Sequence, residues 1–213
     1  MLDGPRWGPK QGRAEQLVVL CHGVGADGHD LIDLAPSWAA ALPQAAFVAP
    51  DAPEPYDSAP MGRQWFPLWN RTPAQMQAGA DAASLLLDDF LDAELARLGL
   101  PGDACALVGF SQGAMIVLHA GPRRAVTPRA ILAYSGALLA PELLAQTQSR
   151  PPILLVHGEA DDVVPASRSR AAECALRAAG FAVDSLFCPR LGHGIDEAGL
   201  AAGALFLQRA CAA

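Results

Sequence analysis

The chain has 213 residues, of which 52% are hydrophobic, and a formal net charge of −7 at pH 7. This charge would repel the phosphates of nucleic acids and of anionic membranes, so we expect no nucleic-acid partner. No unbroken apolar run approaches the roughly 18 residues that cross a bilayer, so stable membrane insertion is not expected. The length suits one domain with a sizeable core, which we expect to span residues 1–213.

The cysteines and the first residues both bear on the compartment. The cysteines are odd in number and lack the C-x-x-C spacing of metal ligands, so structural roles are expected for Cys21, Cys105, Cys174, Cys188 and Cys211. The segment from Met1 to Pro5 lacks the basic and apolar regions of a secretory signal peptide. These features predict a protein of the reducing cytoplasm.

Apolar segments of strand length alternate with helical patterns along the chain. The strand candidates are almost continuously apolar, as parallel strands buried on both faces are: 17–21, 46–49, 105–108, 130–134, 153–156 and 183–187. The longest helical pattern covers 72–98, with Pro73 in its first turn and Gly99 as its stop, and the last covers 196–211. This alternation predicts an α/β fold, with a mostly parallel central sheet that is flanked by helices and binds ligands at the carboxyl ends of its strands.

Residues 109–113 spell G-x-S-x-G in a strand-turn-helix context. The apolar segment 104–108 precedes the motif, and a helical segment at 114–120 follows it. A serine on such a sharp turn is exposed above the sheet edge, and the flanking glycines let neighbouring backbone pass closely. The pattern predicts a nucleophile elbow with Ser111 as the nucleophile.

A serine hydroxyl needs a general base, and the base needs an orienting acid. His193 lies in a loop between the last predicted strand and the last predicted helix, from which a base can reach an elbow serine at the same sheet edge. The remaining histidines occupy turn, strand-end or helical positions that indicate structural roles: His22, His29, His119 and His157.

The acid is expected between Ser111 and His193, because the chain order in this fold is serine, acid, histidine. The segment 157–165 directly follows a strand and offers three carboxylates: Glu159, Asp161 and Asp162. Periodicity does not choose between the two aspartates. The carboxylates that do not orient the histidine are expected to be solvated or to cap the next helix.

Two backbone N–H groups are expected to stabilise the oxyanion that forms during acyl transfer. One belongs to Gln112, the residue after the nucleophile, and the other lies in the loop after the first long strand. The loop 21–28 is rich in glycine and can aim the amide of Val24 inward. It lacks both the Lys-Ser/Thr of a P-loop and the G-x-G-x-x-G spacing of a dinucleotide site, so the oxyanion role is preferred.

With these residues in place, the chain resembles the phospholipase/carboxylesterase family of α/β-hydrolases, to which the acyl-protein thioesterases belong. The resembling pieces, in chain order, are HGVGADGHDL from 22, APDAPEP from 49, GRQWFPL from 62, GFSQGA from 109, HGEADDVVP from 157 and LGHG from 191. The resemblance implies Ser111 as nucleophile, His193 as base and no metal or organic cofactor. It also implies Asp161 rather than Asp162 as the acid, and the amides of Val24 and Gln112 as oxyanion donors.

The chain departs from many relatives at Glu159, where they have Asp, and at Asp162, where they have Pro. Its loop at 52–71 looks closest to bacterial esterases and holds Tyr56, Trp65, Phe66 and Trp69. We expect the aromatic segment from Trp65 to Trp69 to form the acyl-side wall, with Trp65 and Phe66 binding substrate. The alternative is that these aromatics fill the gap over the sheet edge. The short connection from 134 to 153 predicts an open groove without a cap domain.

The sequence therefore predicts a cytoplasmic serine carboxylester hydrolase that acts on short- to medium-chain acyl esters through Ser111, His193 and Asp161. An acyl-protein thioesterase or a lysophospholipase would use the same chemistry. An inactive hydrolase fold that serves as a binding module would be expected to lack a member of the triad, and all three are present. The expected partner is a small-molecule acyl ester, and a homodimer is left open.

Overall fold

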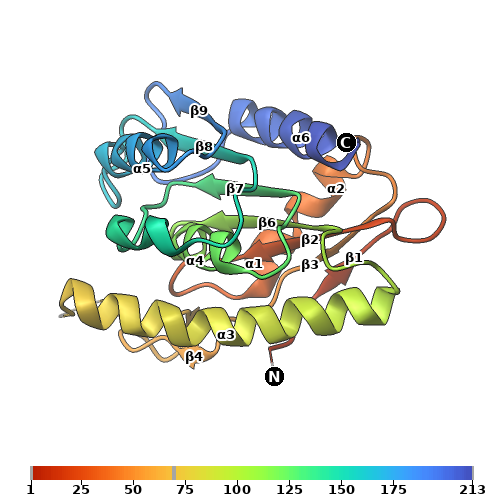
Figure 1. Cartoon of the computed structure of the whole chain (residues 1–213), viewed down its shortest axis with the longest axis horizontal. Coiled ribbons are helices and arrows are strands. Elements are labelled where there is room, and N and C mark those ends of the chain that lie inside the picture. The colour runs from red at the N-terminus through yellow and green to blue at the C-terminus, as the bar shows by residue number, and fades with distance from the viewer. Residues whose placement is uncertain (1, 69–70, 213) are drawn as a thin grey trace.

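A computed structural model describes residues 2–68 and 71–212 and has a seven-stranded sheet at its centre (Figure 1). The strand order is β1-β3-β2-β6-β7-β8-β9. Every neighbouring pair from β3 to β9 is parallel, and these strands are β2 (Gln16–Cys21), β3 (Ala45–Val48), β6 (Cys105–Phe110), β7 (Ala130–Tyr134), β8 (Ile153–Gly158) and β9 (Val183–Cys188). The predicted mostly parallel sheet is confirmed. The short β1 (Arg6–Trp7) adds an antiparallel edge beside β3, which the sequence did not predict.

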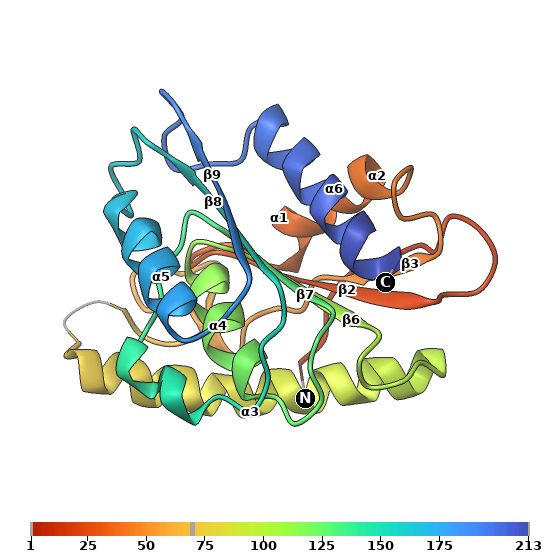
Figure 2. The same ribbon diagram turned by 45° about the horizontal axis from the view of Figure 1, so that its top comes forward.

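Helices cover both faces of the sheet (Figure 2). One face packs against α3 (Pro73–Leu98), α4 (Gln112–Ala120) and α5 (Ser167–Ala178). The other packs against α1 (Gly28–Ile32), α2 (Leu34–Trp38) and α6 (Glu197–Ala212). Two separate apolar clusters fill these layers, which is the reason that the central strands are apolar on both faces. Across the described part of the chain, none of the helices combines the length and apolarity needed to cross a bilayer.

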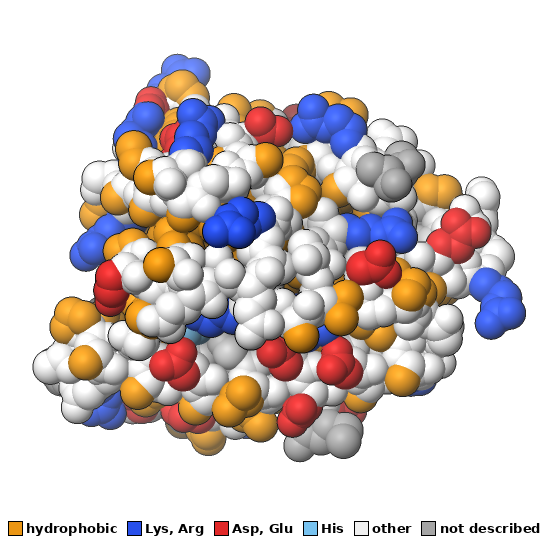
Figure 3. All heavy atoms as spheres, in the orientation of Figure 1, with side chains coloured by type: hydrophobic (Ala, Val, Ile, Leu, Met, Phe, Trp, Pro, Cys, Tyr) orange, Lys and Arg blue, Asp and Glu red, His pale blue; other side chains and the backbone are white. Residues whose placement is uncertain are grey.

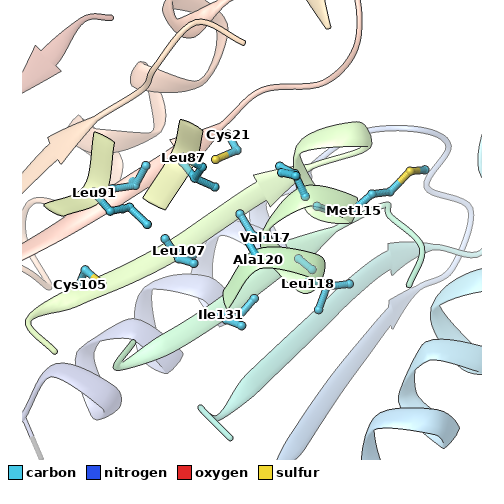
Figure 4. Packing of buried hydrophobic residues seen from close by; sticks show 14 of the residues in the cluster. Cys21, Leu87, Leu91, Cys105, Leu107, Met115, Val117, Leu118, Ala120 and Ile131 are labelled. Carbon is cyan, nitrogen blue, oxygen red and sulfur yellow. The ribbon is translucent and has the colours of Figure 1, made fainter. Parts of the chain in front are cut away.

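The packing beneath α4 fixes the helix that follows Ser111. Figure 4 shows side chains of α4 against Leu107 of β6, Ile131 of β7 and Leu87 of α3. Every residue of α4 is buried, and truncating one core leucine typically costs about 2–5 kcal/mol. Cys21 and Cys105 pack into the same layer, and burial raises the pKa of both thiols, that of Cys105 to about 11. These two cysteines therefore act as small apolar side chains.

The long helix α3 begins and ends where the sequence predicted. Thr72 caps its first turn by accepting a hydrogen bond from the backbone N–H of Gln75, whose side chain accepts one from the N–H of Thr72. Gly99 closes the helix in the left-handed conformation at φ 68°, which a residue with a side chain rarely adopts. The predicted apolar stripe is buried at Ala80, Ala83, Leu87, Leu91 and Leu95.

Two connections at the carboxyl edge of the sheet shape the site. The hairpin of β4 (Glu54–Pro55) and β5 (Arg63–Gln64) is tied to the loop after β2, because the N–H of Gly25 donates to the carbonyl of Arg63 at 2.8 Å. The other connection joins β7 to β8. The segment 135–152 is described throughout, and its only helix is the short 3₁₀ helix η2 (Pro141–Gln146). Another 3₁₀ helix, η1 (Gly121–Arg123), extends α4. The expected absence of a large cap domain is thus confirmed.

Candidate active site

Ser111 stands at the turn between β6 and α4 with φ 55° and ψ −116°. Such backbone angles cost a residue with a side chain on the order of 1–3 kcal/mol. The glycines on either side are required by close backbone approach. A Cβ at Gly113 would overlap the carbonyl oxygen of Cys21, and a Cβ at Gly109 would overlap the carbonyl of Gly113. The G-x-S-x-G pattern is therefore explained by two crowded glycines around one strained serine.

Asp161 and His193 are brought together from the loops after β8 and β9. The His193 Nδ1 lies 2.7 Å from Oδ2 of Asp161. The other carboxylate oxygen, Oδ1, accepts hydrogen bonds from the backbone N–H groups of Val163 at 2.9 Å and Val164 at 2.8 Å. Burial acts to raise the pKa of Asp161, but the hydrogen bonds from His193, Val164 and Val163 outweigh it, so the pKa lies below its ordinary value. Asp161 is therefore ionised at neutral pH.

The carboxylate of Asp161 fixes the tautomer of His193. A neutral imidazole has one N–H, and the nitrogen that faces an ionised carboxylate carries it. The proton thus sits on Nδ1, and Nε2 has a free lone pair. The imidazole lies beside the ring of Phe110, with ring centroids 4.9 Å apart, and 17% of the His193 side chain is exposed. No hydrogen bond joins Ser111 Oγ to His193 within residues 2–68 and 71–212; such contacts often tighten only when substrate binds.

The loops that carry Asp161 and His193 are tied to one another. The N–H of Ala160 donates to the carbonyl of Leu191 at 2.9 Å, and the N–H of Glu159 donates to the carbonyl of Cys188 at 2.9 Å. At Gly158 a Cβ would overlap the carbonyl of Leu191, so the close approach requires glycine. The parallel pairing of β8 with β9 therefore continues into the loops and holds the carboxylate and the imidazole in register.

The structure separates the three carboxylates that the sequence offered. Among the described residues, Asp161 is the one that contacts His193. Asp162 points into solvent, and Glu159 forms an ion pair with Arg170 at 2.5 Å on the surface. Sequence periodicity treats the two adjacent aspartates alike. The backbone donors Val163 and Val164 fold the loop around Asp161 and distinguish it.

The two expected oxyanion donors flank Ser111. Gln112 is the first residue of α4, and Val24 lies in the loop after β2 and lines the same pocket as Ser111. Within the part of the chain that the structure describes, neither backbone N–H has a hydrogen-bond acceptor. The Val24 loop is held from outside, because the indole N–H of Trp65 donates to the carbonyl of His22 at 3.0 Å. Among the described residues, both amides thus lack an acceptor, and a hydrogen bond anchors the segment just before Val24.

Trp65 and Phe66 do not line the pocket, which corrects the expectation of an aromatic acyl-side wall. They are 1% and 0% exposed and pack in the core beside α3 and α4. The side chain of Gln112 fixes this segment, because its Oε1 accepts from the N–H of Trp65 at 2.8 Å and its Nε2 donates to the carbonyl of Phe66 at 2.6 Å. The two aromatics fill the gap over the sheet edge, as the alternative held. Trp69 lies outside the described residues.

An aliphatic pocket of about 310 Å³ opens beside Ser111. Its walls come from separate parts of the chain and include Leu68, Met76, Met115, Leu138 and Val163. The sequence did not point to these residues, because an aliphatic side chain at a loop or helix start carries no local signal of facing a ligand. Among the described residues, no group of three or more His, Cys, Asp and Glu side chains is arranged to hold a metal ion.

The sheet, the strained elbow serine and the paired carboxylate and imidazole define an α/β-hydrolase. A family model described as Phospholipase/Carboxylesterase matches residues 5–211. The chain therefore belongs to the phospholipase/carboxylesterase family of serine hydrolases and is an enzyme of the carboxylesterase type.

Known relatives agree with this assignment. The chain is 32% identical to esterase YpfH of Escherichia coli, over 86% of this chain and 78% of YpfH. It is 26% identical to acyl-protein thioesterase 1 of Neurospora crassa, over 87% of this chain and 82% of that protein. The crystal structure of esterase PE8 superposes with a TM-score of 0.93 at 42% identity and covers 98% of both chains.

Proposed function

We propose that the protein hydrolyses short- to medium-chain carboxylic esters in the cytoplasm, with Ser111 as nucleophile, His193 as general base and Asp161 as orienting acid. The observation that carries this proposal is the hydrogen bond of 2.7 Å between His193 and Asp161, which leaves Nε2 of His193 free to accept a proton. The five free cysteines support a reducing compartment.

The reaction has two halves. Ser111 Oγ attacks the ester carbonyl carbon while Nε2 of His193 takes the hydroxyl proton. The developing oxyanion accepts hydrogen bonds from the amides of Val24 and Gln112, and loss of one such donor typically costs about 10²–10³ in kcat. The intermediate collapses when His193 returns the proton to the departing alcohol, which leaves an acyl group on Ser111. Water, activated by His193, then releases the acid.

Asp161 acts by staying ionised throughout the cycle. Burial acts to raise its pKa, but the hydrogen bonds from His193, Val164 and Val163 together lower it, so its charge faces the imidazole when His193 becomes positive. The charge stabilises the imidazolium and holds the ring in the tautomer that the first step needs. Asp162 is assigned no part in the reaction, because its side chain is exposed and the described contact to His193 is made by Asp161.

The pocket supports the preference for short and medium acyl chains. It measures about 310 Å³, and the connection from β7 to β8, where a cap domain could be inserted, holds only the short helix η2 in the described segment 135–152. Each CH₂ group that stays in water forfeits up to about 0.8 kcal/mol of transfer energy, so gains level off once the chain outgrows the pocket. Thioester hydrolysis is the second candidate, favoured by the likeness to acyl-protein thioesterase 1 of Neurospora crassa.

The test is a hydrolysis panel of p-nitrophenyl esters from acetate to palmitate, with acyl-CoA thioesters and lysophospholipids alongside. Wild type should prefer short to medium esters, and Ser111→Ala should lose turnover by about a millionfold while keeping its circular dichroism spectrum. A fluorophosphonate should label wild type and leave Ser111→Ala unlabelled. Rates that still rise at palmitate would favour the thioesterase or lysophospholipase alternatives, and an unlabelled wild type would favour a binding module.

A further inference from the structure

A second hollow lies next to the pocket beside Ser111. The second hollow has a volume of about 190 Å³, is bounded by η2 and α5, and shares Ala137, Leu138 and Arg168 with the first. Its other walls are Pro141 and the small side chains of Ala171, Ala172 and Ala175. The side chains that line the two hollows, together called the groove below, are apolar apart from Ser111 in the first hollow and Arg168 in both.

Arg168 is the charged side chain in the lining of both hollows. Within residues 2–68 and 71–212, its guanidinium takes part in no ion pair, side-chain hydrogen bond or stacking contact on an aromatic ring. The neighbouring arginines of α5 are paired: Arg170 with Glu159 at 2.5 Å, and Arg177 with Glu173 at 2.8 Å. Arg168 thus differs from these neighbours on α5 in lining the groove and in having no partner for its charge among the described residues.

The lining of the groove differs in charge from the chain as a whole. The chain has 22 acidic residues and a net charge of −7, yet no carboxylate among the described residues lines either hollow. In Figure 3, acidic side chains gather along the band occupied by α3, whereas side chains of both signs are seen over the end of the molecule that holds α5. An anionic group that entered the groove would therefore meet attraction from Arg168 without repulsion from a lining carboxylate.

A guanidinium is well suited to this task. Its planar fork donates two parallel hydrogen bonds to a carboxylate or a phosphate, and such charge-assisted bonds are stronger than neutral ones. Apolar walls lower the local dielectric and strengthen the attraction. Arg168 is exposed, so it can bind the polar end of a molecule whose apolar part lies in the pocket.

We propose that Arg168 binds an anionic group, a carboxylate or a phosphate, at the far end of an ester substrate whose apolar segment fills the pocket beside Ser111. The inference rests on the proposed esterase function and narrows its substrate class. The preferred substrates are esters that combine a short apolar segment with a terminal negative charge, rather than neutral fatty esters. Arg168 thereby sets specificity and takes no part in bond breaking.

The test uses matched pairs of esters and compares the ratio of kcat/KM within each pair. One member is the mono-p-nitrophenyl ester of a dicarboxylic acid with a free terminal carboxylate, and the other has that carboxylate methylated. Wild type should favour the anionic member by about five- to tenfold, a value between those of an exposed ion pair and a charge-assisted hydrogen bond. Arg168→Gln should bring the ratio near one, mainly through KM, because the lost contact exists in ground and transition states alike.

Arg170→Gln is the matched control, because it removes a charge from the same helix that does not line the groove. It should keep the wild-type ratio. In wild type the ratio should also fall as ionic strength rises from about 0.01 to 1 M, over which the screening length shortens from about 30 to 3 Å. A preference that survives in Arg168→Gln would overturn the proposal, and so would a ratio of one or less for wild type in every ester series tested.

Two further arms identify the anion and its place in the substrate. A second series carries the free carboxylate on the alcohol side of the ester, and a third replaces the carboxylate by a phosphate monoester. Selectivity that depends on Arg168 in any series supports the proposal and shows which half of the ester lies in the groove; its absence from all three overturns it. Failure of the esterase function itself would look different, since wild type would then hydrolyse no ester and take up no fluorophosphonate.

Discussion

His157 and His193 contact the same carboxylate oxygen, Oδ2 of Asp161, at 3.2 and 2.7 Å. His157 is 1% exposed, and its Nε2 also lies 2.7 Å from the carbonyl oxygen of Val164. Both neighbours of Nε2 are acceptors, so this nitrogen carries a proton. Its Nδ1 is 2.6 Å from the hydroxyl of Ser169. A buried second imidazole thus braces the loop around the carboxylate that orients the first.

This relationship predicts that replacing His157 changes the chemistry and its pH dependence. In His157→Leu, the carbonyl of Val164 loses its hydrogen-bond donor, so the backbone at Val164 should move. The N–H of Val164 binds the carboxylate of Asp161, so that carboxylate should move with it. A displacement of this kind can lower kcat by up to about 100-fold with little change in KM. The substitution also removes the Nε2–H of His157 from beside Oδ2 of Asp161, so the carboxylate presents more negative charge to His193. This charge favours the protonated imidazole, so the acidic limb of the kcat/KM profile should move to higher pH.

His157→Gln provides the comparison, because its side chain keeps a donor near Val164 and Asp161. Its kcat and pH profile should lie between those of wild type and His157→Leu when both are measured on p-nitrophenyl butyrate from pH 5 to 9. Equal losses in the two variants, with an unmoved acidic limb, would reduce His157 to a packing role.

Neighbouring aspartates should respond very differently to the same change. Asp161→Asn is expected to lower kcat by about 10⁴, because the tautomer and orientation of His193 are lost. Asp162→Asn should stay within about tenfold of wild type, since that side chain is exposed. Steady-state kinetics on a single ester settle the matter, and the reverse order would assign the acid to Asp162.

The lowered pKa of Asp161 has a consequence for stability against acid. Because folding lowers this pKa, the ionised group stabilises the fold at neutral pH, and the contribution is lost as pH falls below the ordinary carboxyl range. The free energy of unfolding, measured with urea, should therefore fall less steeply between about pH 5 and 2 in Asp161→Asn than in wild type. Asp162→Asn should follow the wild-type slope, and a shared slope in all three proteins would contradict the prediction.

The strained backbone of Ser111 predicts an asymmetry between two inactive variants. Ser111→Ala keeps a Cβ at φ 55°, whereas Ser111→Gly relieves the steric conflict. Although glycine gains more freedom in the unfolded chain, we expect Ser111→Gly to be more stable by about 1 kcal/mol, because the strain at such angles is about 1–3 kcal/mol. Thermal unfolding of the two proteins measures the difference, and a more stable alanine variant would show that the elbow stores no strain.

Much of the fold could be predicted because its signals are local. The parallel strands are buried on both faces, so segments such as Ile153–Gly158 are apolar at almost every position. The elbow is likewise encoded in five consecutive residues, since crowding by the backbone of Cys21 demands glycine at 113, and crowding by the backbone of Gly113 demands glycine at 109. In contrast, β1 has only two residues, too few for any periodicity, and is formed by pairing with Phe47 and Val48 far along the chain.

The errors at the site have a long-range cause. The sequence at Trp65 and Phe66 would read the same whether these side chains faced a ligand or the core. Hydrogen bonds from Gln112, 46 and 47 positions away, turn their backbone so that both rings are buried. The free charge of Arg168 was also invisible, because whether an arginine is paired depends on which elements the fold places beside it.

The last prediction follows from the burial of Trp65. It distinguishes residues that support the Val24 loop from residues that shape the pocket. Trp65→Phe removes the indole N–H that binds the carbonyl of His22, so the Val24 loop should loosen and kcat should fall alike for acetate and octanoate esters. Leu68→Ala removes part of the pocket wall, so it should lower kcat/KM several-fold more for octanoate than for acetate esters. This factor corresponds to the loss of one or two CH₂ contacts at about 0.8 kcal/mol each. The ratio of kcat/KM for the two esters measures both effects. If Trp65→Phe changed that ratio and Leu68→Ala left it intact, the result would favour the aromatic segment as the acyl-side wall. The aliphatic pocket would then have no role in chain-length selection.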